Sequence, residues 1–248
     1  MGHHLGRIVF YICSLIYMAI PAYPEPIHLV TEHYPPFTMR INDKTSGSPQ
    51  DPVTGIAVEV VRELFSRAGL EYTIGIYPWA RAYNMALTQE NYGIFTTTRT
   101  PQREPLFKWV CPLSENNLVF FAKKKKNIKL ESLEDARKYS IGGSPRNSTT
   151  MYLIDLGFSL DIAPSNAINI KKLDFGRIDL WATGKLLGSY IAKNEGVSDI
   201  EAVLNFKKTI LCLALNKSID NEIVDKLNSV LKTMIDDGTI EKLQAKYR

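Results

Sequence analysis

Histidine and cysteine, the side chains on which most metal sites and many covalent mechanisms depend, are scarce in this sequence. Its 248 residues include four histidines and three cysteines, and after residue 22 the histidines are His28 and His33. A zinc site needs about three or four such ligands around one ion. No cluster with that spacing occurs, and no serine or cysteine has a histidine placed as its catalytic base. The sequence therefore predicts neither a metal nor another cofactor.

Excess charge of one sign is also small. The formal net charge is +4, and it is scattered along the chain. A nucleic-acid-binding protein would concentrate basic residues on one face, so the composition argues against that function. The lysine run at residues 123–126 is interpreted as a solvated turn or strand end, with a docking patch as the alternative. With 45% hydrophobic residues, the chain can form one large core or two smaller ones.

Long hydrophobic runs are limited to one, "IVFYICSLIYMAIPA" at residues 8–22. This run is shorter than the ~20 apolar residues that cross a bilayer. It follows Arg7 and ends in Ala22, and a basic flank, a short apolar stretch and a small final residue are typical of a secretory signal peptide. We therefore expect residues 1–22 to be removed and the remainder to be a soluble periplasmic protein, with an uncleaved anchor as the alternative.

Two cysteines remain after the expected cleavage, Cys111 and Cys212. Each lies in an apolar, strand-like stretch, "KWVCPL" and "TILCLAL" respectively. Exported proteins often contain disulfides, so these two residues are candidates for a bridge. Two buried free thiols fit the same pattern, and the sequence leaves both states open.

The first part of the mature chain alternates predicted strands and helices. Strands are predicted at residues 27–31, at "EYTIGI" and at "GIFTTT". Residues 55–69 carry apolar side chains at helical spacing and end in Gly69, and a second helix is predicted over residues 79–88. This alternation predicts an α/β domain with a mostly parallel sheet.

A second unit with the same alternation starts near Asn117. Strands are predicted at "NLVFFA", "YSIGG" and "RIDLWAT", with helices that end at Gly157 and that cover residues 186–193. The apolar stretch "KTILCLALN" and a long amphipathic helix over residues 223–235 follow. Two lobes are therefore expected rather than one, and the first lobe is the surface against which the last long helix would bury its apolar face.

The stretch "TTTRTPQREPLFKW" places Arg99 and Arg103 four residues apart after a predicted strand. Its Thr-Pro pair predicts a helix N-terminus, where a cation such as Arg103 opposes the helix dipole and contributes nothing to stability. Helix N-terminal N–H groups and a guanidinium together can bind a carboxylate, and ligands of α/β sheets lie beyond the carboxyl ends of strands. We interpret Arg103, with Thr98, as an anion site; a surface ion pair between Arg103 and Glu104 is the alternative.

Three aromatic residues are further candidates for ligand contact. Tyr34 and Trp79 each lie beside prolines just after a predicted strand, and Trp181 lies in "RIDLWAT". Large aromatic side chains at such positions either fill the core or form flat walls that stack on a ligand. For Trp181 the alternatives are the wall of a cleft and the space between sheet and helix.

An ordered series of short motifs gives the sequence a family resemblance. These motifs are "YPPF", "GIAVEVVREL", "TRTPQRE", "GRIDLW" and "DDGTIEKLQAKY", in this order. Each is weak alone, but in order they resemble the extracytoplasmic solute-binding proteins of family 3, the polar amino acid-binding type that serves ABC importers. The resemblance covers essentially the whole mature chain. The stretches "YPWARA", "TRTPQRE" and "FKWVCPL" look closer to a less characterised subgroup.

This resemblance implies a type II periplasmic binding protein-like fold, in which two α/β lobes are joined by a hinge of two strands. Lobe 1 would contain residues 23–116 and 216–248, and lobe 2 residues 117–215, with hinge strands near 117–121 and 209–215. A small molecule would bind between the lobes, which close around it. An ABC permease in the inner membrane would then recognise the closed protein, which would be a monomer.

The resemblance also implies roles for individual residues. Arg103 matches the arginine that holds the ligand carboxylate, and Thr98 matches the hydroxyl residue five positions before it. Tyr34 and Trp79 match the two aromatics that enclose the ligand side chain. The second lobe would present a loop and a helix N-terminus to the carboxylate through Arg146, Asn147 and Ser148.

One position departs from the family's pattern. The family's amino acid binders carry an acid five residues after the aspartate of "GR-x-D", where it holds the ligand ammonium, and counting from Asp179 gives Gly184. Because a buried ammonium without a partner is costly, an ordinary α-amino acid is not expected. The extra basic residues Arg99, Arg81 and Arg146 favour an anionic or carboxylate-bearing ligand instead.

Two other functions occur on the same fold. An enzyme would need acids near the strand ends, where Glu32 and Glu59 are the candidates, and Glu59 is assigned a structural role. A stand-alone sensor or accessory protein would bind a ligand without a part in transport. The sequence favours a binding protein over both alternatives.

Overall fold

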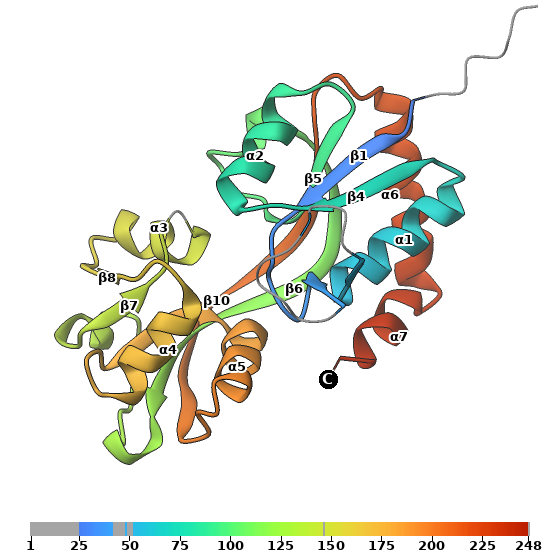
Figure 1. The fold of residues 1–248 in the computed structure, drawn as a ribbon. Helices are drawn as coiled ribbons and strands as arrows, with labels where there is room; N and C mark the ends of the chain where they lie inside the picture. The colour runs from blue at the N-terminus through green and yellow to red at the C-terminus, as the bar shows by residue number, and fades with distance from the viewer. Residues whose placement is uncertain (1–24, 42–47, 49–51, 146, 248) are drawn as a thin grey trace, which may run out of the picture.

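The structure is a computed structural model that describes residues 25–41, 48, 52–145 and 147–247. It has two lobes, and two long strands run from one lobe to the other (Figure 1). These strands are β6 (Lys108–Lys123) and β10 (Ile200–Leu215), which pair antiparallel with register shifts at three places. Within the described residues, eight strands form one sheet in the order β4-β1-β5-β10-β6-β9-β7-β8. The expected α/β fold of two lobes joined by two strands is therefore confirmed.

The predicted signal peptide, residues 1–22, lies outside the described residues. Among the helices that are described, none is long and apolar enough to cross a membrane.

Lobe 1 contains the parallel strands that the sequence predicts. β1 (Ile27–Thr31) lies between β4 (Tyr72–Ile76) and β5 (Tyr92–Thr98) and pairs parallel to both. A short antiparallel pair, β2 (Met39–Arg40) and β3 (Val53–Thr54), precedes the first helix. On the other side of β5, the sheet continues into the crossing strands β10 and β6.

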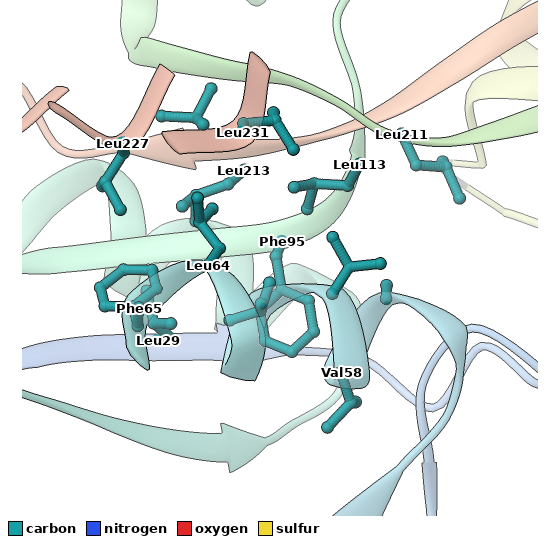
Figure 2. Close-up of a cluster of buried hydrophobic side chains, with 14 of the residues drawn as sticks. Leu29, Val58, Leu64, Phe65, Phe95, Leu113, Leu211, Leu213, Leu227 and Leu231 are labelled. Atoms are coloured by element: carbon teal, nitrogen blue, oxygen red, sulfur yellow. The ribbon is translucent and has the colours of Figure 1, made fainter. Parts of the chain in front are cut away.

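Helices cover both faces of the sheet in lobe 1. α1 (Ile56–Ala68) and α6 (Asn221–Asp236) pack on one face, and α2 (Trp79–Thr88) packs on the other. Figure 2 shows the larger cluster, in which Leu64 of α1 lies close to Leu227 and Leu231 of α6. Each fully buried leucine or phenylalanine contributes about 2 kcal/mol by its transfer from water.

The end of the chain returns to lobe 1, as the amphipathic pattern of residues 223–235 predicts. α6 buries its apolar face in the lobe 1 cluster, and α7 (Thr239–Ala245) follows it. After α7, the Lys246 ammonium and the Tyr247 hydroxyl each donate a hydrogen bond to the Glu59 carboxylate, at 2.7 and 2.6 Å. These contacts give Glu59 of α1 the structural role that was assigned to it.

Lobe 2 extends the sheet beyond β6. β9 (Leu180–Gly184) pairs antiparallel to β6, β7 (Ile141–Gly143) pairs parallel to β9, and β8 (Asp161–Ile162) pairs parallel to β7. One face buries side chains of α3 (Ser148–Asp155). The other face is covered by α4 (Asn166–Asp174) and α5 (Lys185–Asn194).

Cys111 and Cys212 form a disulfide with their Cα atoms 4.8 Å apart. They lie on β6 and β10 in lobe 1, and the 101-residue separation between them contains all of lobe 2. Of the two states that the sequence left open, the structure contains the bridge.

The α-helix predicted to start after Thr100 is wrong. Residues 101–103 form a turn, and a single 3-10 turn, Glu104–Leu106, follows. Pro105 lacks the N–H that a continuing α-helix would need at that position, and it disfavours the helical conformation for the residue before it. Arg103 therefore precedes a 3-10 turn instead of lying in the first turn of an α-helix.

Candidate functional site

A cavity of about 520 Å³ lies between the two lobes. It is lined by residues 32–34, 78–80 and 164–166 and by Thr96, Thr98, Arg103, Ser144, Pro145, Asn147, Ser148 and Leu211, and is called the polar cavity below. Most of its lining residues lie at the ends of β1, β4 and β5 in lobe 1 and of β7 and β8 in lobe 2, or shortly after them. The cavity is thus at the carboxyl ends of the parallel strands, where ligands of α/β sheets bind.

Three α-helices begin at the polar cavity. Trp79 is the first residue of α2, Ser148 of α3 and Asn166 of α4, and all three line the cavity. The Asn147 side chain caps α3 by accepting a hydrogen bond from Thr149 N at 2.8 Å. Because a helix N-terminus carries a partial positive charge, these ends favour a negatively charged group in the cavity.

Arg103 supplies the full positive charge. Its guanidinium carbon lies 4.9 Å from the centre of the Trp79 ring and 5.4 Å from that of Tyr83. Arg103 Nη1 also donates a hydrogen bond to the Thr98 carbonyl at 3.2 Å. Burial lowers the pKa of Arg103 from its ordinary value, and nearby Tyr83 and Glu32 oppose this shift.

No salt bridge joins Arg103 to another residue that the structure describes. The acid that was its expected surface partner, Glu104, instead forms two hydrogen bonds of 2.5 Å with Arg99. Two aromatic rings and one carbonyl therefore hold the Arg103 side chain at the cavity while its charge is left for a ligand.

Thr98 and Ser148, both predicted site residues, meet across the cleft. The Ser148 hydroxyl donates to Thr98 Oγ1 at 3.4 Å. This contact joins the N-terminus of α3 in lobe 2 to the end of β5 in lobe 1. A ligand that contacts either hydroxyl would therefore affect both lobes.

Thr96 is a lining residue that the sequence interpretation did not include. The pairing of β5 with β10 shifts near this position, which is a β-bulge, and Thr96 has a φ of 63°. A β-branched residue rarely adopts this left-handed conformation. Its hydroxyl is buried and makes no hydrogen bond within the described residues, so a ligand that bonds to it would recover about 1–3 kcal/mol.

Tyr34 closes one corner of the cavity, beside Gly184. The Tyr34 ring stacks on Phe37 at 5.8 Å between centres. Burial raises the pKa of Tyr34, the charge of Glu32 raises it further, and the nearby Asn116 side chain opposes both. A Cβ atom added to Gly184 would lie 2.7 Å from Asn116 Oδ1 and 3.0 Å from the Tyr34 hydroxyl. The space that a side chain at position 184 would need is thus occupied.

Replacing Gly184 with alanine should displace the side chains of Tyr34 and Asn116. We expect Gly184→Ala to lower the free energy of unfolding by about 1–3 kcal/mol through overpacking, measured by thermal or denaturant unfolding. Gly188→Ala, whose Cβ would meet Phe121 at 2.3 Å, gives a reference for an overpacked glycine that does not contact Tyr34 or Asn116. A Gly184→Ala protein as stable as the wild type would show that Tyr34 and Asn116 move aside freely.

Glu32 is the carboxylate of the polar cavity. It directly follows β1 and is half-buried. Burial raises its pKa to about 7, and the positive charge of Arg103 keeps it from rising further. The sequence interpretation noticed Glu32 only as a candidate acid for an enzyme.

The assignment of Trp181 to the ligand site is wrong. Trp181 is fully buried on β9, and its ring lies 6.0 Å from that of Phe121 in the core of lobe 2. The residue points between sheet and helices because its neighbours Leu180 and Ala182 pack on the opposite face. Arg146, another predicted site residue, lies outside the described residues.

Arg99 lines a different hollow, called the outer groove. This groove has a volume of about 1230 Å³ and shares Trp79, Ala80, Thr98, Arg103 and Ser148 with the polar cavity. Arg99 is paired with Glu104 there, and both side chains are nearly half exposed. The supporting role expected for Arg99 stays a prediction, and its position makes that role indirect.

Of the predicted site residues, the polar cavity brings together Tyr34, Trp79, Thr98, Arg103, Asn147 and Ser148. The lining residues that were missed include Glu32, Thr96 and residues 164–166, which lead into α4. The helix signal for α4 was available in "PSNAINIKKL", where a serine precedes a run with apolar residues at helical spacing.

Comparisons with known proteins identify the family. The sequence model of the bacterial extracellular solute-binding proteins, family 3, matches residues 27–248. The L-cystine-binding protein TcyA of Bacillus subtilis (strain 168) is 22% identical over 215 residues, which cover 86% of this chain and 77% of TcyA. The family consists of binding proteins, so an enzymatic activity is not assigned.

Solved structures show the same type II periplasmic binding protein fold. A histidine kinase sensor domain with similarity to periplasmic binding proteins matches with a TM-score of 0.78 and 18% identity, covering 90% of this chain and 95% of its own. An ABC uptake transporter substrate-binding protein from Streptococcus pneumoniae with bound histidine matches with a TM-score of 0.74 and 16% identity, covering 90% and 92%. This chain belongs to the bacterial extracellular solute-binding proteins of family 3.

Proposed function

We propose that this protein is a periplasmic solute-binding protein that captures a small carboxylate-bearing ligand between its lobes and delivers it to an ABC importer. The observation that carries the proposal is Arg103, a half-buried cation held at the polar cavity by Trp79 and Tyr83. An arginine binds a carboxylate with two parallel hydrogen bonds, and the helix ends at the same cavity favour the same charge. The named ligands of the relatives, L-cystine and histidine, both carry carboxylates.

Ligand contacts from both lobes would drive their closure. Lobe 1 offers Arg103 and Thr98, and lobe 2 offers Asn147 and Ser148 at the start of α3. A molecule that bonds to both sets binds the closed form more tightly than the open one, so it shifts the protein toward closure. The closed form is the signal that a permease would recognise.

A thermal-shift screen of the protein without residues 1–22 tests the proposal. The compounds are amino acids, organic acids, polyamines and short peptides. A ligand at a hundredfold excess over its Kd should stabilise the protein by about 2.7 kcal/mol, and we expect such shifts only with carboxylate-bearing compounds. Stabilisation by cations or neutral compounds alone would contradict the proposal.

Ligand sensing without transport is the second candidate, because a histidine kinase sensor domain shares this fold. Transport into vesicles that contain the permease and its ATPase separates the two functions. Uptake that depends on this protein supports delivery to an importer. Binding without any dependence of uptake on the protein supports sensing.

A further inference from the structure

The outer groove differs from the polar cavity in the chemistry of its lining. Three large apolar side chains line it from three separate elements: Leu106 ends the 3-10 turn of lobe 1, Met151 lies on α3 in lobe 2, and Ile210 lies on the crossing strand β10. They are 37%, 45% and 37% exposed. Single exposed apolar side chains are ordinary, but several that line one hollow indicate a site for an apolar group.

Two aromatic rings extend this apolar lining. Tyr83 of α2 lines the groove in lobe 1, and Tyr152 of α3 lines it in lobe 2. The two helices lie on the same side of the crossing strands (Figure 1). The flexible side chain of Met151 can adapt to ligands of different shape. An apolar segment in the groove would thus contact both lobes and would favour their closure.

The charges along the groove largely cancel one another. Arg99 and Lys208 each form a salt bridge with a glutamate, at 2.5 and 2.6 Å. Lys207 Nζ lies 3.5 Å from the centre of the Tyr152 ring, and Asp155, another lining residue, carries the opposite charge. Apart from the arginine that it shares with the polar cavity, the groove is therefore close to neutral.

The groove and the polar cavity adjoin each other at Arg103. They share five lining residues, among them Trp79 and Arg103. The Arg103 guanidinium lies over the rings of Trp79 and Tyr83, and Tyr83 lines the groove alone. A carboxylate that Arg103 holds in the polar cavity is therefore next to the groove, and the charge of Arg103 determines which end of a ligand lies there.

An apolar segment would be unfavourable in the polar cavity itself. It would cover the half-buried Glu32 carboxylate and the Thr96 hydroxyl, which makes no hydrogen bond within the described residues. Polar groups that lose water without gaining another hydrogen-bond partner raise the free energy of the complex. The neutral, apolar lining of the outer groove does not impose this cost.

We infer that the outer groove is a second subsite, which binds the extended apolar chain of a ligand whose carboxylate is held by Arg103. This inference rests on the proposed function and narrows its ligand class to carboxylates with an apolar chain that reaches from the polar cavity into the groove. No ammonium group is needed. The inference therefore agrees with the glycine at position 184, from which an ordinary α-amino acid is not expected.

A series of carboxylates with growing chains tests the inference: butyrate, hexanoate, octanoate and decanoate. Their affinities for the wild type are measured by isothermal titration calorimetry, and the weak members are measured by displacement against a tighter one. A fully buried methylene strengthens binding about fourfold, and a half-buried methylene about twofold. We therefore expect decanoate to bind at least about 16-fold more tightly than hexanoate.

A pair of double variants locates the chain. Leu106→Ala with Met151→Ala removes apolar contacts from both walls of the groove. The matched control is Leu87→Ala with Ile154→Ala, whose side chains are 37% and 44% exposed and line neither hollow. We expect the groove variant to bind decanoate about tenfold more weakly and butyrate within about twofold of the wild type. The control should bind both as the wild type does.

The contribution of the carboxylate is measured with the same chain on other head groups. Octylamine and 1-octanol should each bind at least about tenfold more weakly than octanoate, because neither can accept two parallel hydrogen bonds from Arg103. Arg103→Ala should weaken every carboxylate of the series and leave the gain per methylene unchanged.

Three results would overturn the inference while leaving the proposed function intact. The first is an affinity that does not rise with chain length, or a series that does not bind although other carboxylates do. The second is a groove variant that binds decanoate as tightly as the control variant does. The third is 1-octanol binding as tightly as octanoate. If the wild type binds no carboxylate at all, the proposed function itself fails and the inference fails with it.

Discussion

Replacing Arg103 with alanine should weaken binding of the carboxylate ligand by at least about 100-fold, which corresponds to about 2.7 kcal/mol. The guanidinium lies on two aromatic rings and has no acid partner among the described residues, so no other group is placed to take over its contact. Arg103→Lys keeps the charge but loses the planar fork, and we expect an intermediate loss of about tenfold. Calorimetry with the strongest ligand from the thermal-shift screen measures both variants.

Arg99→Ala is the matched control for Arg103. It removes an arginine from the same segment, but Arg99 lies in the outer groove, paired with Glu104, and does not line the polar cavity. Exposed ion pairs contribute about 0–1 kcal/mol, so stability and affinity should both change little. An affinity loss in Arg99→Ala equal to that in Arg103→Ala would place the anion site in the outer groove instead.

Removing the disulfide should lower the free energy of unfolding by about 3–5 kcal/mol. The bridge closes a loop of about a hundred residues, and it restricts the unfolded chain correspondingly. The Cys111→Ala, Cys212→Ala double variant avoids a polar group at the fully buried Cys212. Denaturant unfolding with and without a reductant measures the effect.

The reductant supplies the control for this prediction. It should destabilise the wild type toward the level of the double variant and leave the double variant unchanged. Ligand affinity should be nearly unchanged, because neither cysteine lines the polar cavity. A stability difference under about 1 kcal/mol would show that the bridge adds little to a hinge already held by strand pairing.

The sequence predicted the elements whose signals are local. The helix over residues 79–88 matches α2, and the stop at Gly69 matches the end of α1, because helical spacing and a left-handed glycine are local patterns. The helix after Thr100 was wrong for an equally local reason. The Thr-Pro start signal was given more weight than Pro105, which ends the turn.

Residues of the candidate site could be predicted where their position relative to the end of a strand decides whether they reach the cavity. Thr98 and Arg103 line the cavity because they lie at the carboxyl end of β5 and shortly after it. Trp181 was misplaced because the face of a strand depends on register with its neighbours, which one strand alone does not reveal. Glu32 was not predicted as a residue of the ligand site. Only the fold brings it to the same cavity as Arg103, which is 71 positions away in the sequence.

The covalent link between the crossing strands also determines how this protein would respond to mechanical force. A pull on the two ends of the chain passes from lobe 1 through Cys111 directly to Cys212, so residues 112–211 lie off the path of tension. Lobe 1 would unfold under the force. Lobe 2 would stay folded, because it lies inside the loop that the disulfide closes. In a single-molecule pulling experiment the extension gained on full unfolding should therefore lack the contour length of lobe 2, and a reductant should restore it.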